Sequence, residues 1–469
     1  MLRPRQQYTI YRGASESSPR LILLFLGWGM DAMPFRSLMK PGYDIVALYD
    51  YTDDDAPPCM PPGSYGEVVV VAWSFGVRAA ADFMRSASMP VTRTIAVNGT
   101  ESHVDDSAGI PRRIFDATMA SLSEASIEKF RRRMFRSMDD YKDFGAVAPG
   151  RGFESLKEEL EVFARVAPAA VQAEWSMAVI GGRDLIFPPD AQRHAWRDVH
   201  VEEFTDMPHF ADLQMILDRF VVDKELVATR FAGASHTYDA NAEVQSETAA
   251  WLWRRVKDTA GLPDAPVAVL EVGAGSGMLT RRYLPELNLK SLEIWDLAAP
   301  PVCPLPACAR TVICDAESRI DAVAPGSLDF MLSSSTVQWF HAPEKFLRKA
   351  AVTLRPGGVM ALTYYAQGTC RELAVAGGVS LAYPCHAWML EALAGSGLEI
   401  VYEDTAPVVA RFDSPREALR HLKTTGVNAL GRNSRAGAAA IGLVRHYPLD
   451  DDGKAPLTFV KACIIAVKK

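Results

Sequence analysis

A serine, an aspartate and a histidine occur in this chain in an order that suits covalent ester chemistry. Ser74 follows the apolar run 68–73, Asp184 follows a later apolar run, and His209 lies further along the chain. A serine nucleophile needs a base that takes its proton, and the base needs a carboxylate that stabilises its charged form. Three other histidines could act as the base but suit the order of the expected strands less well: His103, His194 and His200.

The residues around Ser74 predict a buried strand, a sharp turn and a helix. Four consecutive valines suit a parallel strand that is covered on both faces. Ala72 and Gly76 are small, as a nucleophile elbow requires, and the order Ser, Asp, His is that of α/β-hydrolases. The backbone N–H groups of Phe75 and Trp28 are the candidate oxyanion donors. The alternative interpretation is that Ser74 only caps a helix.

A second group of residues in the other half of the chain could bind a cofactor. The apolar run 267–272 contains one acidic residue near its end, Glu271. A glycine turn follows, formed by Gly273, Gly275 and Gly277. Glycines let a backbone approach a ligand closely. The G-x-G-x-G spacing departs from the dinucleotide fingerprint. It resembles the S-adenosylmethionine loop of class I methyltransferases.

This resemblance implies roles for several acidic residues at strand ends. A carboxylate near the glycine turn suits the cofactor's ammonium group, and Asp296 is placed to accept hydrogen bonds from ribose hydroxyls. Asp296 could instead cap a helix. Asp315 could meet the adenine amino group, and two further cofactor contacts are expected at Ala316 and Ser333.

Strands and helices alternate in both halves, which predicts two α/β domains built on parallel sheets. We expect an N-terminal α/β-hydrolase domain at residues 1–228 and a C-terminal, Rossmann-like class I methyltransferase domain at residues 229–469. A charged helical segment from about 111 to 168 is expected to form a cap over the first sheet. It contains a basic stretch that could dock an acidic partner or be a solvated helix face, with Arg131, Arg132, Arg133 and Arg136 as its arginines.

The overall composition excludes several classes of function. The chain has 469 residues and a net charge of −7, which argues against a nucleic-acid partner. No apolar run approaches the ~20 residues needed to span a bilayer. The N-terminal residues are polar, so we expect a cytoplasmic protein without a secretion signal. The seven cysteines lack paired C-x-x-C spacing, so we expect reduced thiols and no metal site.

Four motifs of the first half resemble a biotin-pathway carboxylesterase family that removes the methyl ester from pimeloyl-[acyl-carrier protein]. They are Phe25–Asp31, Trp73–Val77, Asp184–Pro188 and Pro208–Phe210. The resemblance covers roughly residues 8 to 225. It implies a Ser74, His209 and Asp184 esterase that acts on an acyl-carrier protein.

Three motifs of the second half resemble malonyl-[acyl-carrier protein] O-methyltransferase, of the same pathway. They are Ser334–Trp339, Gln367–Leu373 and Leu422–Asn428, and the resemblance covers about 230 to 468. A malonyl carboxylate is already an anion at neutral pH, so methyl transfer needs alignment and no general base. Three cations could grip that carboxylate or the carrier's phosphopantetheine, or be solvated surface charges: Arg371, Arg420 and Lys423.

Together the two resemblances imply one chain that adds a methyl group and later removes it. The methyl group would hide a charge that is costly to bury in enzymes built for apolar acyl chains. Two alternatives stay open. A general acyl esterase or thioesterase fused to a small-molecule methyltransferase would prefer free esters. A non-catalytic, hydrolase-like docking module would leave Ser74 unreactive towards a fluorophosphonate.

Overall fold

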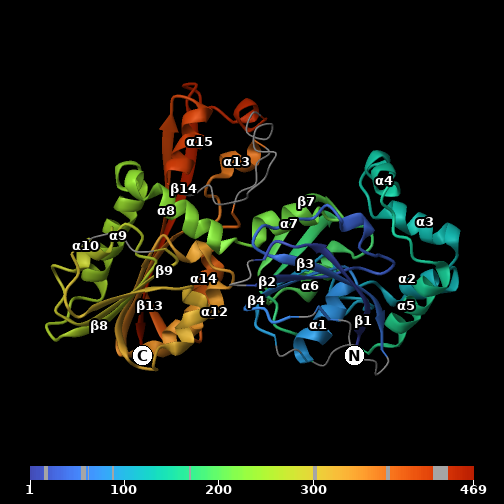
Figure 1. Cartoon of the computed structure of the whole chain (residues 1–469), viewed down its shortest axis with the longest axis horizontal. Coiled ribbons are helices and arrows are strands. Elements are labelled where there is room, and N and C mark those ends of the chain that lie inside the picture. Colours follow the sequence, from blue (N-terminus) through green and yellow to red (C-terminus); the bar gives the residue numbers. More distant parts are fainter. Residues whose placement is uncertain are drawn as a thin grey trace. The chain divides into compact units, whose positions relative to one another are not determined.

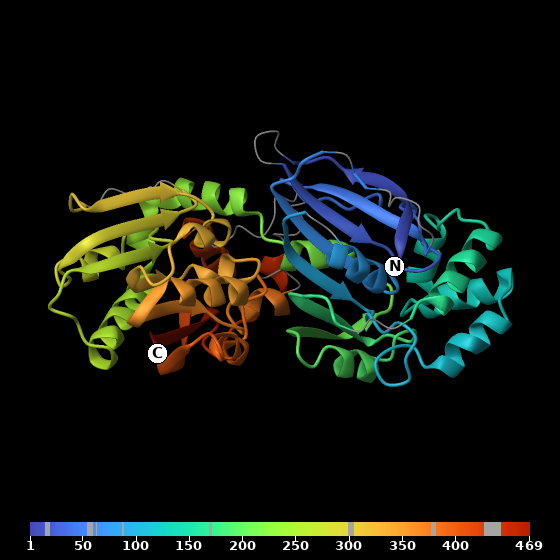
Figure 2. The same cartoon turned by 90° about the horizontal axis from the view of Figure 1, so that it is seen from below.

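The computed structural model describes residues 1–14, 19–53, 60–61, 63–86, 89–167, 171–298, 304–376, 381–425 and 442–469, with only the backbone for 234–237 (Figures 1 and 2). The chain divides into two compact units, Met1–Leu217 and Asp218–Lys469. The expected domain boundary between residues 228 and 229 falls within the helix α8 (Lys224–Asn241) and stays a prediction.

The first unit is built on a seven-stranded sheet with the order β1-β3-β2-β4-β5-β6-β7. β1 is antiparallel to β3, and all other neighbours are parallel. The two central strands β2 and β4 are almost wholly apolar and buried, as a sheet covered on both faces requires. The strands are β1 (Arg3–Tyr11), β2 (Arg20–Phe25), β3 (Asp44–Thr52), β4 (Glu67–Trp73), β5 (Val91–Val97), β6 (Met177–Arg183) and β7 (Val201–Pro208).

The helices of this unit fall into two sets. One set connects the strands: η1 (Met33–Phe35), α1 (Gly76–Ser86), α6 (Pro189–Ala195) and α7 (Leu213–Phe220). The other set lies between β5 and β6 in sequence and forms the cap at one side of the sheet in both views (Figures 1 and 2). It consists of α2 (Arg112–Ala120), α3 (Glu124–Arg133), α4 (Met138–Gly145) and α5 (Phe153–Arg165).

The second unit also has a seven-stranded sheet, with the order β10-β9-β8-β11-β12-β14-β13. Its first five strands are parallel, and β14 runs antiparallel to both β12 and β13. The strands are β8 (Val267–Val272), β9 (Leu289–Asp296), β10 (Ala309–Ile313), β11 (Leu328–Ser334), β12 (Leu354–Tyr365), β13 (Leu398–Phe412) and β14 (Ala455–Lys468).

Helices cover both faces of this second sheet. Leu252 and Val256 of α9 pack into one apolar core, and Leu347 of α12 and Leu393 of α14 pack into another. The helices are α8, α9 (Glu243–Thr259), α10 (Thr280–Tyr283), α11 (Ala316–Arg319), η2 (Ile320–Ala322), η3 (Val337–Trp339), α12 (Pro343–Thr353), α13 (Arg371–Val375), α14 (His386–Leu393) and α15 (Pro415–Thr424). The two expected α/β folds are confirmed. Among the described residues, no helix has the length and apolar character to cross a bilayer.

Candidate active sites

Ser74 occupies a tight turn between β4 and α1. Its φ is +58°, in the left-handed region that residues with a side chain rarely adopt. Glycines let neighbouring backbone pass close to this turn. A Cβ on Gly27 would lie 2.8 Å from the Ser74 Cβ, and a Cβ on Gly99 would lie 2.3 Å from the Ser74 carbonyl oxygen. At Gly76, a Cβ would lie 2.3 Å from the Phe25 carbonyl oxygen, so the predicted requirement for a small residue has a steric cause.

Ser74, His209 and Asp184 form a hydrogen-bonded row. The His209 Nε2 lies 3.0 Å from the Ser74 Oγ, and its Nδ1 lies 2.9 Å from the Asp184 Oδ2. All three residues are at most 4% exposed. The other Asp184 oxygen accepts the backbone N–H groups of Ile186 and Phe187, which fixes the carboxylate. In this arrangement the imidazole can take the hydroxyl proton while the carboxylate stabilises the imidazolium.

Hydrogen bonds hold the loop that carries His209 against the neighbouring strands. The Trp73 Nε1 donates to the His209 carbonyl oxygen at 2.7 Å. The Asn98 amide donates to the Pro208 carbonyl oxygen at 2.8 Å and accepts the Gly181 N–H at 2.7 Å. Asn98, the residue after β5, therefore helps to hold the His209 loop, a contact that the sequence did not indicate beyond its place after an apolar strand.

The alternative histidines lie elsewhere. The His103 Nε2 is 2.8 Å from the Phe163 carbonyl oxygen, and burial lowers the His103 pKa to about 4. His200 lies 3.7 Å from Glu202. In the part of the chain that the structure describes, neither of them nor His194 has a hydrogen bond to Ser74.

Two backbone groups are free to stabilise an oxyanion. The N–H groups of Trp28 and Phe75 donate to no other residue among those described. The Phe75 ring belongs to an apolar aromatic cluster beside the nucleophile, and its nearest ring is Phe163 at 4.6 Å. The other aromatic members are Phe115 and Phe187.

The basic stretch of the cap has an apolar side that packs onto these loops. The Phe130 ring meets the Trp28 ring edge to face at 5.0 Å, and the Phe135 ring lies 4.8 Å from Phe210, the residue after the base. Met134 is fully buried, and its carbonyl oxygen accepts the Phe210 N–H at 2.9 Å.

The arginines of this stretch differ in their surroundings. Arg132 is exposed, whereas Arg131 lies 3.7 Å from Glu128. Arg133 donates to the Leu185 carbonyl oxygen at 2.7 Å. Arg136 lies 3.9 Å from Asp206 and is half exposed. The structure thus presents the stretch as a cationic surface with several local partners.

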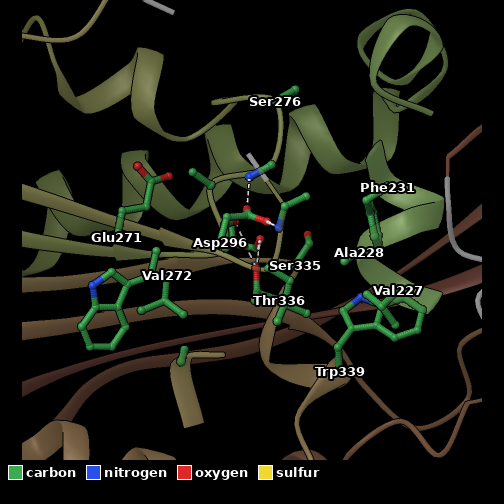
Figure 3. A pocket seen from close by; sticks show the side chains of 18 of the residues that line it. Val227, Ala228, Phe231, Glu271, Val272, Ser276, Asp296, Ser335, Thr336 and Trp339 are labelled. Atoms are coloured by element: carbon green, nitrogen blue, oxygen red, sulfur yellow. Dashed lines mark hydrogen bonds between the residues drawn. The ribbon is translucent and has the colours of Figure 1, made fainter. Parts of the chain in front are cut away.

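A cavity of about 460 Å³ opens in the second unit at the carboxyl ends of β8, β9 and β11 (Figure 3). Its volume is within the range of about 300–1,000 Å³ that is typical of small-molecule sites. Six of the predicted cofactor residues line it: Glu271, Gly273, Gly275, Asp296, Asp315 and Ala316. The glycine turn, Asp296 and Ser335 stand close together in Figure 3.

The glycine turn is needed for two different reasons. Gly273 has a φ of +73°, and a Cβ there would lie 2.1 Å from the Thr336 Oγ1, so a side chain is excluded sterically. Gly275 has a φ of +51°, and no described atom lies within 4 Å of the position of its missing Cβ. Its backbone therefore stays open to a ligand. Gly277, with a φ of +78°, does not line the cavity.

Two carboxylates of the cavity wall are held by neighbouring donors. The Asp296 Oδ2 accepts the Gly275 N–H at 2.8 Å, and burial raises the Asp296 pKa. Glu271 accepts hydrogen bonds from the hydroxyls of Thr280 at 2.7 Å and Tyr283 at 2.6 Å. Burial raises the Glu271 pKa to about 7.

Asp315 has partners that the sequence did not reveal. Its Oδ2 accepts from the Lys224 Nζ at 2.5 Å, and its Oδ1 caps α11 by accepting the Glu317 N–H at 3.1 Å. Lys224 also lines the cavity. An adenine amino group at Asp315 would therefore share this carboxylate with a lysine.

The remaining predicted residues lie away from the cavity wall. Ser333 is fully buried and donates to the Val272 carbonyl oxygen at 2.8 Å, while Ser334 and Ser335 line the cavity. Three cations are exposed and do not line it: Arg371, Arg420 and Lys423. In the motif Leu422–Asn428 of the methyltransferase resemblance, residues 426–428 lie outside the described residues.

Five aromatic residues line the cavity and were missed as site residues: Phe231, Tyr238, Trp295, Trp339 and Phe340. The Phe231 ring of α8 meets the Trp339 ring of η3 at 5.9 Å, and both line one end of the cavity (Figure 3). Trp339 belongs to a motif of the methyltransferase resemblance, whereas Phe231 carried no signal.

The two folds and their sites define an α/β-hydrolase unit joined to a class I methyltransferase unit. The model of the family "Pimeloyl-ACP methyl esterase BioG" matches residues 11–215, and a methyltransferase-domain model matches residues 270–362. A malonyl-[acyl-carrier protein] O-methyltransferase of Bacteroides fragilis is 32% identical over 464 residues, which is 96% of this chain and 93% of that protein. The chain therefore belongs to the malonyl-[acyl-carrier protein] O-methyltransferase family, with a BioG esterase domain ahead of its methyltransferase domain.

Other relatives match one half of the chain. A malonyl-[acyl-carrier protein] O-methyltransferase of Chlorobium phaeovibrioides is 33% identical over 233 residues, 48% of this chain and 89% of that protein. The crystal structure of BioG from Haemophilus influenzae aligns at 28% identity with a TM-score of 0.38, covering 44% of this chain and 94% of that chain.

Proposed function

We propose that this chain catalyses two opposite reactions on acyl-carrier proteins. One reaction methylates the free carboxyl of a malonyl group, with S-adenosylmethionine as the donor. The other hydrolyses the methyl ester of a pimeloyl group. The hydrogen-bonded row of Ser74, His209 and Asp184, at 3.0 and 2.9 Å within the segment that matches BioG, carries the proposal. The full-length relative named for the methylation supports the other half.

In the proposed esterase reaction the Ser74 Oγ attacks the ester carbonyl while the His209 Nε2 takes its proton. The N–H groups of Trp28 and Phe75 stabilise the oxyanion that forms on the carbonyl oxygen. His209 then gives the proton to the departing methanol. Water, activated by the same imidazole, releases the free acid, and Asp184 stabilises the imidazolium at both steps.

In the proposed methyl transfer, the second unit binds and orients two substrates. S-adenosylmethionine supplies a methyl group activated on a sulfonium. The cavity fits this cofactor, because a partly buried carboxylate, Asp296, faces it beside an open glycine backbone. We assign the cofactor to the predicted residues that line the cavity, Glu271, Gly273, Gly275, Asp296, Asp315 and Ala316, and leave out Gly277 and Ser333, which do not line it. The acceptor carboxylate is already charged, so we assign no catalytic base and expect alignment to dominate.

We further propose that cationic residues hold the carrier, since acyl-carrier proteins are acidic. On the cap these are Arg131, Arg132, Arg133 and Arg136, and on the second unit Arg371, Arg420 and Lys423. Apart from Arg131, whose side chain is 17% exposed, they are exposed, which suits a contact with a folded protein partner.

The proposal is tested with the purified full chain and intact mass spectrometry of the carrier. With S-adenosylmethionine, malonyl-carrier is expected to gain one methyl group, and the variant Gly273→Ala is expected to lose this reaction because of its clash with Thr336. The methyl ester of the carrier-bound pimeloyl group is expected to be hydrolysed faster than the dimethyl ester of the same acid without a carrier. Preference for the free ester would instead support a general esterase. A Ser74 that does not react with a fluorophosphonate would support a docking module.

A further inference from the structure

A buried ionic cluster joins the cap to the loop that follows β2. Arg151, just before α5, forms an ion pair with Glu159 of α5 at 2.7 Å and another with Asp50 at 2.7 Å. The Glu159 side chain is fully buried, and the Arg151 side chain is 8% exposed. Burying an ion pair is costly and is weak evidence for a role in stability. The position of this cluster therefore calls for a functional explanation.

Glu159 holds the candidate oxyanion loop directly at Gly29 and indirectly through Tyr51 of β3. Its Oε2 accepts the Gly29 N–H at 3.1 Å, and its Oε1 accepts the Tyr51 N–H at 3.1 Å. The Tyr51 hydroxyl in turn donates to the carbonyl oxygen of Leu26, at the start of the loop, at 2.8 Å. Gly29 has a φ of +76°, so the loop turns sharply at the point that Glu159 binds.

The cap holds the same loop at further points. The Trp28 Nε1 donates to the Leu156 carbonyl oxygen at 2.8 Å, and the Gly150 N–H donates to the Asp31 carboxylate at 2.8 Å. The Phe130 ring packs on the Trp28 ring at 5.0 Å. Side chains or backbone of the cap thus fix residues 28, 29 and 31.

This loop passes directly beside the nucleophile. A Cβ on Gly27 would lie 2.8 Å from the Ser74 Cβ, and the candidate donor, the Trp28 N–H, is one peptide from Gly29. We propose that Glu159 is a positioning residue that sets the direction of the Trp28 N–H through Gly29, so the cap aligns the oxyanion donor. This inference rests on the proposed esterase function of Ser74.

The variant Glu159→Gln tests it, because it keeps the shape of the side chain but removes the charge that holds Arg151 and both N–H groups. We expect kcat for the carrier-bound methyl ester to fall about 10- to 100-fold, while KM changes by less than about threefold. The rate at which a fluorophosphonate labels Ser74 is expected to fall by a similar factor, because that reaction also places negative charge at the same donors.

Glu158→Gln is the matched control. Glu158 is the neighbouring residue, its side chain is 62% exposed, and its ion pair with Arg5 at 3.4 Å lies on the surface. Both rates are expected to stay at the wild-type level. A second variant, Phe130→Leu, loosens the contact on Trp28 without disturbing a buried charge, and it is expected to lower both rates in the same way. An unchanged melting transition of the first unit shows that each variant is folded, because methyltransferase activity reports only on the second unit.

The inference is overturned if Glu159→Gln and Phe130→Leu label Ser74 at the wild-type rate, or if only KM changes. Labelling does not depend on the natural ester. If the wild type is labelled but leaves the pimeloyl ester intact, the proposed substrate is contradicted. The labelling rates of the variants would still decide the role of Glu159. A wild type that is not labelled would contradict both.

Discussion

Two carboxylates line one cavity but accept different hydrogen bonds: Glu271, which is buried, and Asp296, which is partly buried. Burial raises the pKa of both. Asp296 accepts backbone N–H groups, which favour its charged form against burial. Among the described residues, Glu271 accepts from the hydroxyls of Thr280 and Tyr283, and burial still raises its pKa to about 7. We therefore expect Glu271 to change its charge near neutral pH.

A pH-dependent stability follows for Glu271. Because its folded pKa lies above the unfolded value, the folded state binds more protons, so its contribution to stability falls as pH rises from about 4.5 to about 7. Glu271→Gln has no charge to bury. We expect the variant to gain roughly 3 kcal/mol in free energy of unfolding relative to the wild type across this window.

Calorimetry between pH 5 and 8 measures this difference. The transition of the methyltransferase unit is the one that shifts when S-adenosylhomocysteine is added. A difference between variant and wild type that stays constant over this range would contradict the expected titration of Glu271.

Residues that carry a local pattern were predictable, and residues that act through distant contacts were not. The valine run and the small residues around Ser74 indicated the turn, and the spacing of the glycines indicated the cavity. Asn98 reaches the loop of His209 only in the folded sheet. Lys224 meets Asp315 from a helix far earlier in the chain, so no spacing in the sequence indicates their contact.

For the cap as an element, the sequence also predicted the local structure but not the distant contacts. Its helical, charged character indicated a helical cap at about residues 111–168, but not which loops the cap would hold. Phe130 and Glu159 face the loop after β2, while Arg132 faces away from the protein. In the second unit, the alternation of strands and helices indicated the parallel strands. It missed β13 and β14, because an antiparallel pair needs no helix between its strands.

The exposed face of α3 predicts carrier-specific kinetics. Arg132→Glu reverses a charge without removing a hydrogen bond that the structure shows. We expect KM for the carrier-bound methyl ester to rise about 5- to 20-fold at low salt and the effect to shrink at high salt. Hydrolysis of a small free ester should not change.

Lys142→Glu on α4 is the control for this test. Lys142 is also exposed and pairs locally with Asp139 at 3.1 Å. An equal rise in KM for both variants would mean that only net charge matters, and it would contradict a docking role for the Arg132 face.

At the scale of the whole molecule, the two proposed activities oppose each other, so the esterase must spare the short malonyl ester. The rings of Phe75, Phe115, Phe163 and Phe187 pack together beside Ser74 and are at most 5% exposed. We expect the longer acyl chain to pack against them. Each methylene group gains about 0.8 kcal/mol when buried.

We therefore expect kcat/KM for the pimeloyl methyl ester to exceed that for the malonyl methyl ester by roughly 100-fold, both on the same carrier. Comparison of the two esters under identical conditions measures this ratio. Phe163→Ala should lower it mainly by slowing the longer ester. Equal kcat/KM values for the two esters with the wild type would show that the esterase site does not discriminate between substrates by chain length.

The most direct test of the central claim compares wild type with Ser74→Ala on the pimeloyl methyl ester of the carrier. Intact mass spectrometry should show that the wild type removes the mass of one methylene group. Ser74→Ala should react more slowly by about 10⁴-fold or more, while an unchanged melting transition of the first unit shows that this unit is folded. Hydrolysis by Ser74→Ala at the wild-type rate would contradict the roles of Ser74, His209 and Asp184, and no hydrolysis by either protein would contradict the esterase function itself.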